Sequence, residues 1–237
     1  MYGRVQDIAG RTLLLLDMNG TFMFGEDRFG ENEDYSLIYR QLGGGLPADQ
    51  VNRLIAETYT WLEQRYPDPQ YREQFPALSA ALKETAAASL PVSEINLLID
   101  TFAYHELGYV APEYAAVLHR LSQEYLLAAV IDIWAPKRLW LETFREAGID
   151  SLFSAYWFSS DHGIVKPSPR AFHYMLDEFN CMAEQTLMIG DSVNRDLLGA
   201  AGAGIDCILV GGEQDPRACA CFDNLPELAD AMLGQSV

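Results

Sequence analysis

The feature that most constrains the fold is a short apolar run that ends abruptly on an aspartate. Thr12 to Leu16 reads TLLLL, and Asp17 and Gly20 end it. A run of this length with no charged residue is typical of a strand buried on both faces of a parallel sheet. Open parallel sheets bind ligands beyond the carboxyl ends of their strands, so this strand delivers a carboxylate to the place where chemistry is expected.

After Gly108 the sequence alternates between strand and helix patterns. Apolar runs predict strands at 126–133, 155–158, 186–189 and 207–210, and prolines at 112 and 136 open two of the intervening helices. Further helices are predicted at 169–179 and near 195–203. The predicted fold class is therefore α/β, a doubly wound parallel sheet covered by helices on both faces, with right-handed crossovers.

Between the first strand and this alternating part lies a stretch with helical periodicity only. Its apolar positions recur at spacings of three and four, as in Val51, Leu54, Ile55, Thr58, Leu62 and Tyr66. Ser93 is a candidate N-cap for a second helix that Gly108 would end, and 43–45 is a glycine loop between helices. We expect two domains, an α/β core of residues 1–22 and 108–237 and a helical cap of residues 23–107.

Charge excludes several classes of partner. The chain has 16 Lys and Arg against 34 Asp and Glu, a formal net charge of −18. Such a surface repels the phosphate backbone of nucleic acids and anionic lipid headgroups, so neither a nucleic acid nor a membrane is an expected partner. Residues 1–8 lack the apolar core of a secretory signal, and a cytoplasmic protein is expected.

The four cysteines do not show the spacing of a zinc site. Cys181, Cys207, Cys219 and Cys221 all lie in the last quarter of the chain and form no C-x-x-C pair. We interpret them as reduced thiols, with Cys219 and Cys221 in a loop.

The residues that directly follow the predicted strands are unusually polar. Asp17, Asn19, Gly20 and Thr21 follow the first strand, Asp132 ends the second, Lys166 follows the third, and Gly190, Asp191 and Asp196 follow the fourth. One aspartate after a strand is usually a turn former or N-cap, but several at one sheet edge favour a site. Their carboxylates would repel one another unless Lys166 or a divalent cation lay between them, and hard oxygen ligands indicate Mg²⁺.

Four ordered segments resemble the motifs of the haloacid dehalogenase superfamily. They are LLLLDMNGT at 13–21, the strand ending near Asp132, GIVKPSPRAF with Lys166, and IGDSVNRDLLGAAGAG at 189–204. The helical stretch is similar to the family's C1-type cap, preceded by a short flap at 24–30.

The resemblance implies a hydrolase with specific residue roles. Asp17 would be the nucleophile and a metal ligand, and Asn19 would contribute its backbone carbonyl to the metal. Lys166 would hold the phosphoryl oxygens, Asp191 would bind Mg²⁺, and Asp196 would join or orient the metal site. Gly20, Thr21 and Asp132 are the candidate substrate-binding residues, and the implied substrate is a small phosphorylated metabolite.

Two departures from the family pattern keep other functions open. Asn19 stands where phosphatases of the family usually carry a second aspartate that acts as general acid and base. Asp132 stands where a hydroxyl residue is usual, so it must turn away, carry a proton, or face a ligand other than a phosphate monoester. The alternatives are a catalytically impaired binding or regulatory protein, a dehalogenase, and a phosphonatase-type hydrolase whose required cap lysine could only be Lys83.

Overall fold

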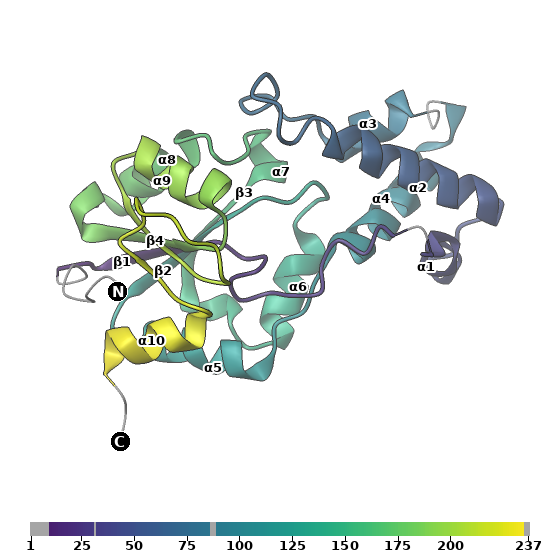
Figure 1. Cartoon of the computed structure of the whole chain (residues 1–237). Coiled ribbons are helices and arrows are strands. Elements are labelled where there is room, and N and C mark those ends of the chain that lie inside the picture. The colour runs from purple at the N-terminus through teal and green to yellow at the C-terminus, as the bar shows by residue number, and fades with distance from the viewer. Residues whose placement is uncertain (1–9, 31, 86–88, 235–237) are drawn as a thin grey trace.

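The computed structural model describes residues 10–30, 32–85 and 89–234, and a six-stranded parallel sheet forms the core of its larger part (Figure 1). The strand order is β3-β2-β1-β4-β5-β6, and every neighbouring pair is parallel. The strands are β1 (Leu13–Leu16), β2 (Leu126–Ile131), β3 (Phe153–Phe158), β4 (Thr186–Gly190), β5 (Asp206–Leu209) and β6 (Ala220–Cys221). This order confirms the predicted doubly wound fold and places the reversal of strand order between β1 and β4.

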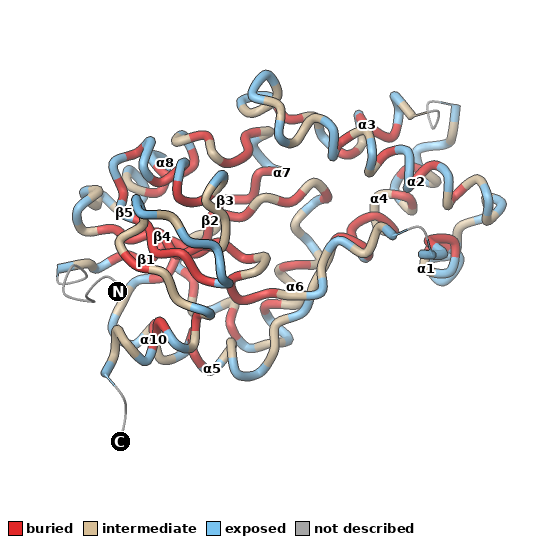
Figure 2. Tube along the Cα trace, in the orientation of Figure 1, coloured by how far each residue is buried: buried red, intermediate tan, exposed pale blue. Residues whose placement is uncertain are grey.

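Helices cover both faces of the sheet, which explains the uniformly apolar strands. Leu13 and Leu15 of β1 pack with residues of α8 (Arg170–Phe179) and α9 (Leu198–Gly202). Leu14 and Leu16 face the opposite layer, which contains α5 (Pro112–Leu121), α6 (Arg138–Glu146) and α10 (Leu225–Leu233). All four leucines are fully buried, as are most residues of the central strands (Figure 2). The sheet is thus a rigid platform for the loops at its carboxyl edge.

The helical stretch forms a group of its own beside the sheet. It contains α1 (Tyr35–Gln41), α2 (Ala48–Glu63), α3 (Leu78–Glu84) and α4 (Val92–Glu106), which pack against one another and lie to one side of the sheet (Figure 1). Their buried residues follow the predicted spacing of three and four, with Val51, Leu54, Ile55, Thr58 and Leu62 buried in α2. The exact domain limits at residues 22 and 107 stay a prediction.

The two chain segments that join the helical group to the sheet run side by side. Phe24 and Tyr109 exchange both backbone hydrogen bonds, at 3.0 and 2.8 Å, in an antiparallel bridge. Gly108 allows this pairing, because a Cβ there would lie 2.6 Å from the carbonyl oxygen of Phe24. The sequence predicts hinges between the two domains at 22–25 and 107–111, and the bridge joins these two segments.

Several local predictions differ from the structure at element ends. The helix predicted from Ser93 begins at Val92 with Pro91 as its N-cap, and the helix predicted from Pro136 begins at Arg138. The stretch near 195–203 is a π-helix over Val193–Leu197 followed by α9. The edge strand β6 was not predicted and includes Cys221, so the interpretation of that residue as part of a loop was wrong.

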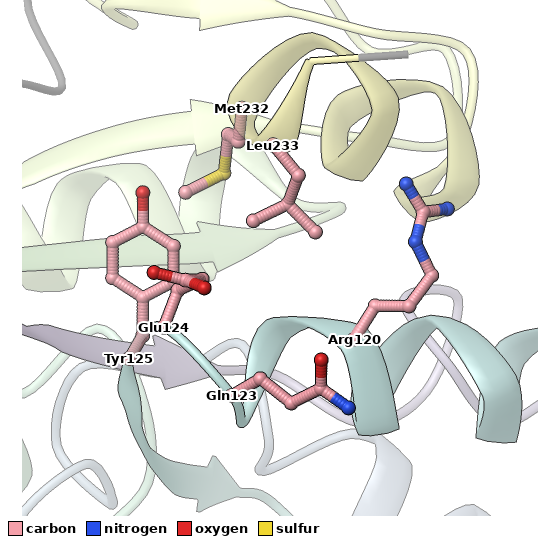
Figure 3. A pocket seen from close by; sticks show the side chains of 6 residues that line it. All are labelled: Arg120, Gln123, Glu124, Tyr125, Met232 and Leu233. Carbon is pink, nitrogen blue, oxygen red and sulfur yellow. The ribbon is translucent and has the colours of Figure 1, made fainter. Parts of the chain in front are cut away.

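Short helical elements connect the main strands and helices. The short helix α7 (Ser159–His162) follows β3, and 3₁₀ turns cover Asp150–Leu152 and Ala183–Gln185. A pocket between the end of α5 and α10 is lined by Arg120, Tyr125 and Leu233 among others (Figure 3). Tyr125 directly precedes β2, so the pocket lies at the amino ends of the strands, opposite the candidate site. All four cysteines are free thiols. Among the described residues, we find no helix with both the length and the apolar character to cross a membrane.

Candidate active site

A buried lysine joins carboxylates from two strand ends. The Lys166 ammonium lies 2.5 Å from Oδ1 of Asp17, directly after β1, and 2.7 Å from Oδ1 of Asp196, in the π-helix after β4. The three residues are at most 7% exposed. The second oxygen of Asp196 accepts the backbone N–H of Ser192 at 3.0 Å, so both oxygens of this carboxylate have donors. Asp196 therefore orients the lysine toward Asp17.

Asp191 completes a group of three carboxylates at the same edge. One carboxylate oxygen from each of Asp17, Asp191 and Asp196 lies within 4.8 Å of the other two. Two glycines make the approach possible. A Cβ at Gly20, whose φ is +69°, would clash with the Asp191 carboxylate, and a Cβ at Gly190 would clash with that of Asp196.

The electrostatics of the group show more negative charge than the lysine balances. Burial raises the pKa of Asp17 well above its ordinary value, and the neighbouring Asp196 raises it further, while Lys166 lowers it. Burial, with Asp196 second, raises the pKa of Asp191 to about 6. Three carboxylates and one ammonium carry a formal charge of −3 + 1 = −2 when ionised. The group is therefore suited to hold one divalent cation.

The turn after β1 brings Asn19, Gly20 and Thr21 next to Asp17. Backbone bonds from Gly20 to Met23 and from Thr21 to Met18 close the turn, at 3.0 and 3.2 Å. Within the described part of the chain, the buried Asn19 Oδ1 and Thr21 Oγ1 have no hydrogen-bond partner. A tight turn with unsatisfied polar atoms is what a site for a polar ligand requires.

Asp132 follows β2 directly and bonds to two other segments. Its Oδ2 accepts the Tyr66 hydroxyl at 2.8 Å and the Lys166 backbone N–H at 2.9 Å. Its Oδ1 is buried and has no partner among the described residues. Burial raises the pKa of Asp132 above its ordinary value, whereas Lys166 and the Tyr66 hydrogen bond lower it. The carboxyl group is thus held beside the lysine by a tyrosine from the helical group.

Three residues around the site were not singled out from the sequence. The Arg195 guanidinium stacks 3.4 Å from the centre of the Tyr66 ring and donates to the Lys166 carbonyl at 2.7 Å. The Glu106 carboxylate, at the end of α4, accepts the backbone N–H groups of Trp134 and Ala135 at 2.6 and 2.9 Å. Arg195 is the one cation in the acidic segment GDSVNRD, and this position could have marked it as a site residue. The sequence around Tyr66 and Glu106 contains no comparable signal.

Comparison with known proteins agrees with this geometry. The chain matches the haloacid dehalogenase-like hydrolases over residues 12–204, a span that contains all four motifs. It belongs to this family. The shared region begins just before β1 and ends after α9, so it includes Asp17, Lys166, Asp191 and Asp196.

The matched relatives include a protein named as a phosphatase. A glyceraldehyde 3-phosphate phosphatase from Methanothermobacter thermautotrophicus is 28% identical over 121 residues, 49% of this chain and 53% of that protein. The chain thus spans about half the length of the curated relatives it matches.

Two solved structures share the fold along nearly the whole chain. A 2-haloacid dehalogenase from Pseudomonas syringae pv. tomato DC3000 superposes with a TM-score of 0.63 and 20% identity over 94% of this chain and 98% of that one. The HAD hydrolase YfnB from Bacillus subtilis, solved bound to magnesium, superposes with a TM-score of 0.59 and 20% identity over the same shares.

Proposed function

We propose that the protein is a Mg²⁺-dependent phosphatase that hydrolyses small phosphorylated metabolites through an aspartyl-phosphate on Asp17. The observation that carries this proposal is the group of Asp17, Asp191 and Asp196, whose oxygens lie within 4.8 Å of one another, with Lys166 bonded to Asp17 and Asp196. The matched relative named as a phosphatase supports the reaction class.

The residues of the sheet edge support the following roles. The Asp17 carboxylate attacks phosphorus, and Lys166 holds that carboxylate in place and balances charge on the phosphoryl oxygens. The backbone N–H groups of Gly20 and Thr21 are used within the turn, so the Thr21 hydroxyl, unpaired among the described residues, would be the donor to the phosphoryl group. Water then attacks the phosphorus of the acyl-phosphate, which frees Asp17 and releases inorganic phosphate.

The donor set fits Mg²⁺. Asp17 and Asp191 would supply carboxylate oxygens and Asn19 its backbone carbonyl, while Asp196, with both oxygens already bonded, would orient the group. One carboxylate oxygen from each of Asp17, Asp191 and Asp196 lies within 4.8 Å of the other two, close enough for one small divalent cation to be held between them. The ion would supply electrostatic stabilisation of the phosphoryl charge.

We also propose that residues 23–107 form a cap domain that acts as a lid over Asp17. Supporting this, Tyr66 reaches Asp132 and Arg195 from the helical group, and Glu106 bonds the loop after β2. The paired segments at Phe24 and Tyr109 provide a hinge. Such a lid would exclude water while the phosphoryl group is transferred.

Two other functions remain as competing proposals. A dehalogenase shares the fold, but it has no need for a metal, and the acidic pair Asp191 and Asp196 argues against it. A binding protein without turnover would explain Asn19. It would not explain why Asp17, Lys166 and Asp196 keep a hydrogen-bonded arrangement suited to catalysis.

The proposed function is tested by phosphate release from a panel of small phosphate esters with and without Mg²⁺. We expect Mg²⁺-dependent turnover, no turnover by Asp17→Asn, and a higher Mg²⁺ requirement in Asp191→Asn. The variant Asp150→Asn, outside this group, is the control and should behave as wild type. Metal-independent halide release from 2-haloacids, or metal binding without any turnover, would favour the competing proposals.

A further inference from the structure

We propose that Asp132, held by Tyr66, performs the proton transfers that Asn19 cannot perform. This inference rests on the proposed phosphatase function and deepens it by naming the acid and base of the reaction. Asn19 has an amide, which neither protonates a leaving oxygen nor takes a proton from water at neutral pH. A phosphatase with this residue needs another proton carrier or loses much of its rate.

The bonding of Asp132 leaves one oxygen free for this role. Oδ2 is occupied by the Tyr66 hydroxyl and the Lys166 backbone N–H, at 2.8 and 2.9 Å. Oδ1 is buried without a partner among the described residues, so a proton on the carboxyl group belongs there. A neutral carboxyl also removes the repulsion that an ionised Asp132 would exert on a phosphate.

The other acids next to Lys166 are already engaged. Among the described residues, three carboxyl groups bond to Lys166: its ammonium contacts Asp17 and Asp196, and its backbone N–H donates to Asp132. Asp17 is the nucleophile, and both oxygens of Asp196 accept hydrogen bonds. Asp132 is the one of the three outside the Asp17, Asp191 and Asp196 group.

The charged and titratable groups that face Asp132 come from three segments. Tyr66 comes from the segment after α2, Lys166 from the loop after α7, and Arg195 from the π-helix. The Arg195 guanidinium stacks on the Tyr66 ring and so fixes the direction of the hydroxyl. Tyr66 is a positioning residue in this arrangement, since it acts through Asp132.

The proton balance is as follows. An Asp17 oxygen forms a bond to phosphorus as the ester P–O bond breaks, and the leaving oxygen takes the proton from Asp132 Oδ1. Water then attacks phosphorus and gives a proton to Asp132 as the bond between Asp17 and phosphorus breaks. The sum is ester plus water giving alcohol plus inorganic phosphate, with Asp132 returned to its starting form.

The first test compares two leaving groups in Asp132→Asn, whose amide oxygen still accepts from Tyr66 and Lys166. With glycerol phosphate, kcat should fall about 10²–10⁴-fold, because the alkoxide leaves only with a proton. With p-nitrophenyl phosphate, the nitrophenolate leaves without a proton, so the first step should stay fast. One equivalent of nitrophenolate per active site should then appear as a burst, followed by slow turnover because the second step lacks its base. Adding Asn19→Asp should restore glycerol phosphate turnover.

The second test is the pH profile of Tyr66→Phe, which keeps the ring under Arg195. The Tyr66 hydroxyl donates a hydrogen bond that favours the ionised form of Asp132, so its loss should raise the pKa of Asp132. The basic limb of the kcat/KM pH profile should therefore move up by about 1–2 pH units. Tyr59→Phe, with no bond to Asp132, is the control and should leave the limb in place. A purely structural role would lower kcat/KM without moving the limb.

The two levels of proposal fail in distinguishable ways. No hydrolysis of either ester by the folded wild type with Mg²⁺ would overturn the phosphatase function. An active wild type whose Asp132→Asn variant hydrolyses glycerol phosphate at an unchanged rate would overturn only the role of Asp132. A burst, the Asn19→Asp rescue and the shifted limb together would establish it.

Discussion

Replacing Lys166 by methionine should destabilise the protein strongly, because it removes the cation from a buried acidic group. The lysine is 3% exposed and lies 2.5 and 2.7 Å from oxygens of Asp17 and Asp196. Breaking a buried ion pair by removing one partner costs about 3–5 kcal/mol. In a protein of this size each kcal/mol lowers Tm by about 2–4 °C, so the expected fall is about 6–20 °C.

The stability lost in Lys166→Met should depend on pH and should be larger at neutral than at acidic pH. Burial and neighbouring carboxylates raise the pKa of Asp17, and that of Asp191 to about 6. An acid whose pKa is higher in the folded state than in the unfolded state contributes stability below its unfolded pKa, and this is lost as pH rises through the folded value. Without Lys166 the pKa values of Asp17 and Asp191 rise further. The loss of stability in Lys166→Met should therefore be largest near neutral pH and become smaller toward about pH 5.

The assay is thermal unfolding without metal, from pH 5 to pH 8, followed by circular dichroism. Lys137→Met is the matched control, since Lys137 pairs with Asp161 on the surface and the two side chains are 44% and 38% exposed. Its cost should be about 0–1 kcal/mol with little pH dependence. If Lys166→Met unfolds at the temperature of this control, or its deficit grows as pH falls, the reasoning is refuted.

Two further substitutions test the geometry around the site. Gly20→Ala should cost more than about 1 kcal/mol and weaken the rise of Tm with Mg²⁺, because φ is +69° and the methyl group would meet the Asp191 carboxylate. Gly45→Ala, where a Cβ meets nothing within 4 Å, is its control, and equal effects would contradict the prediction. Burial raises the pKa of Glu106 from 4.5 to about 8. The stability that this group contributes when protonated is therefore lost as pH rises from about 4.5 to about 8. Relative to wild type, Glu106→Gln should therefore gain up to about 1.4 kcal/mol per pH unit between those values in urea unfolding, and a constant difference would argue against it.

The sheet and its carboxylates could be predicted because the carboxyl ends of parallel strands lie at one edge of the sheet. Asp17 and Asp191 follow two strands that are neighbours in the sheet, and their apolar runs were visible in the sequence. Lys166 follows the third strand in a loop, and topology again leads to the same edge. These placements depend on backbone connectivity, which a pattern of apolar runs encodes directly.

The contacts between the helical group and the sheet could not be predicted in the same way. The apolar spacing of α2 extends to Tyr66 and predicts a core position for it, yet its hydroxyl donates a hydrogen bond to Asp132. The spacing of apolar residues along a helix does not show which part of the sheet the helical group contacts. The buried acceptor role of Glu106 has the same origin, since its partners Trp134 and Ala135 lie in another part of the chain.

Element ends were the least predictable part of the fold. The side chain of Ser93 suits an N-cap, but Pro91 already has the extended backbone that precedes a helix. The helix α4 therefore begins at the next residue, Val92. The two-residue strand β6 is too short to leave a periodic signal. Such differences leave the site unchanged, because none of its side chains lies in these segments.

The most direct test of the central proposal is a search for the covalent intermediate on Asp17. Wild-type protein with Mg²⁺ would be mixed with p-nitrophenyl phosphate, quenched in acid within one turnover, digested and analysed by mass spectrometry. We predict one added phosphoryl group on the peptide that contains Asp17, and none in Asp17→Asn. Turnover of the ester with Asp17 unmodified at every quench time, or a phosphoryl group on a different residue, would contradict the proposal.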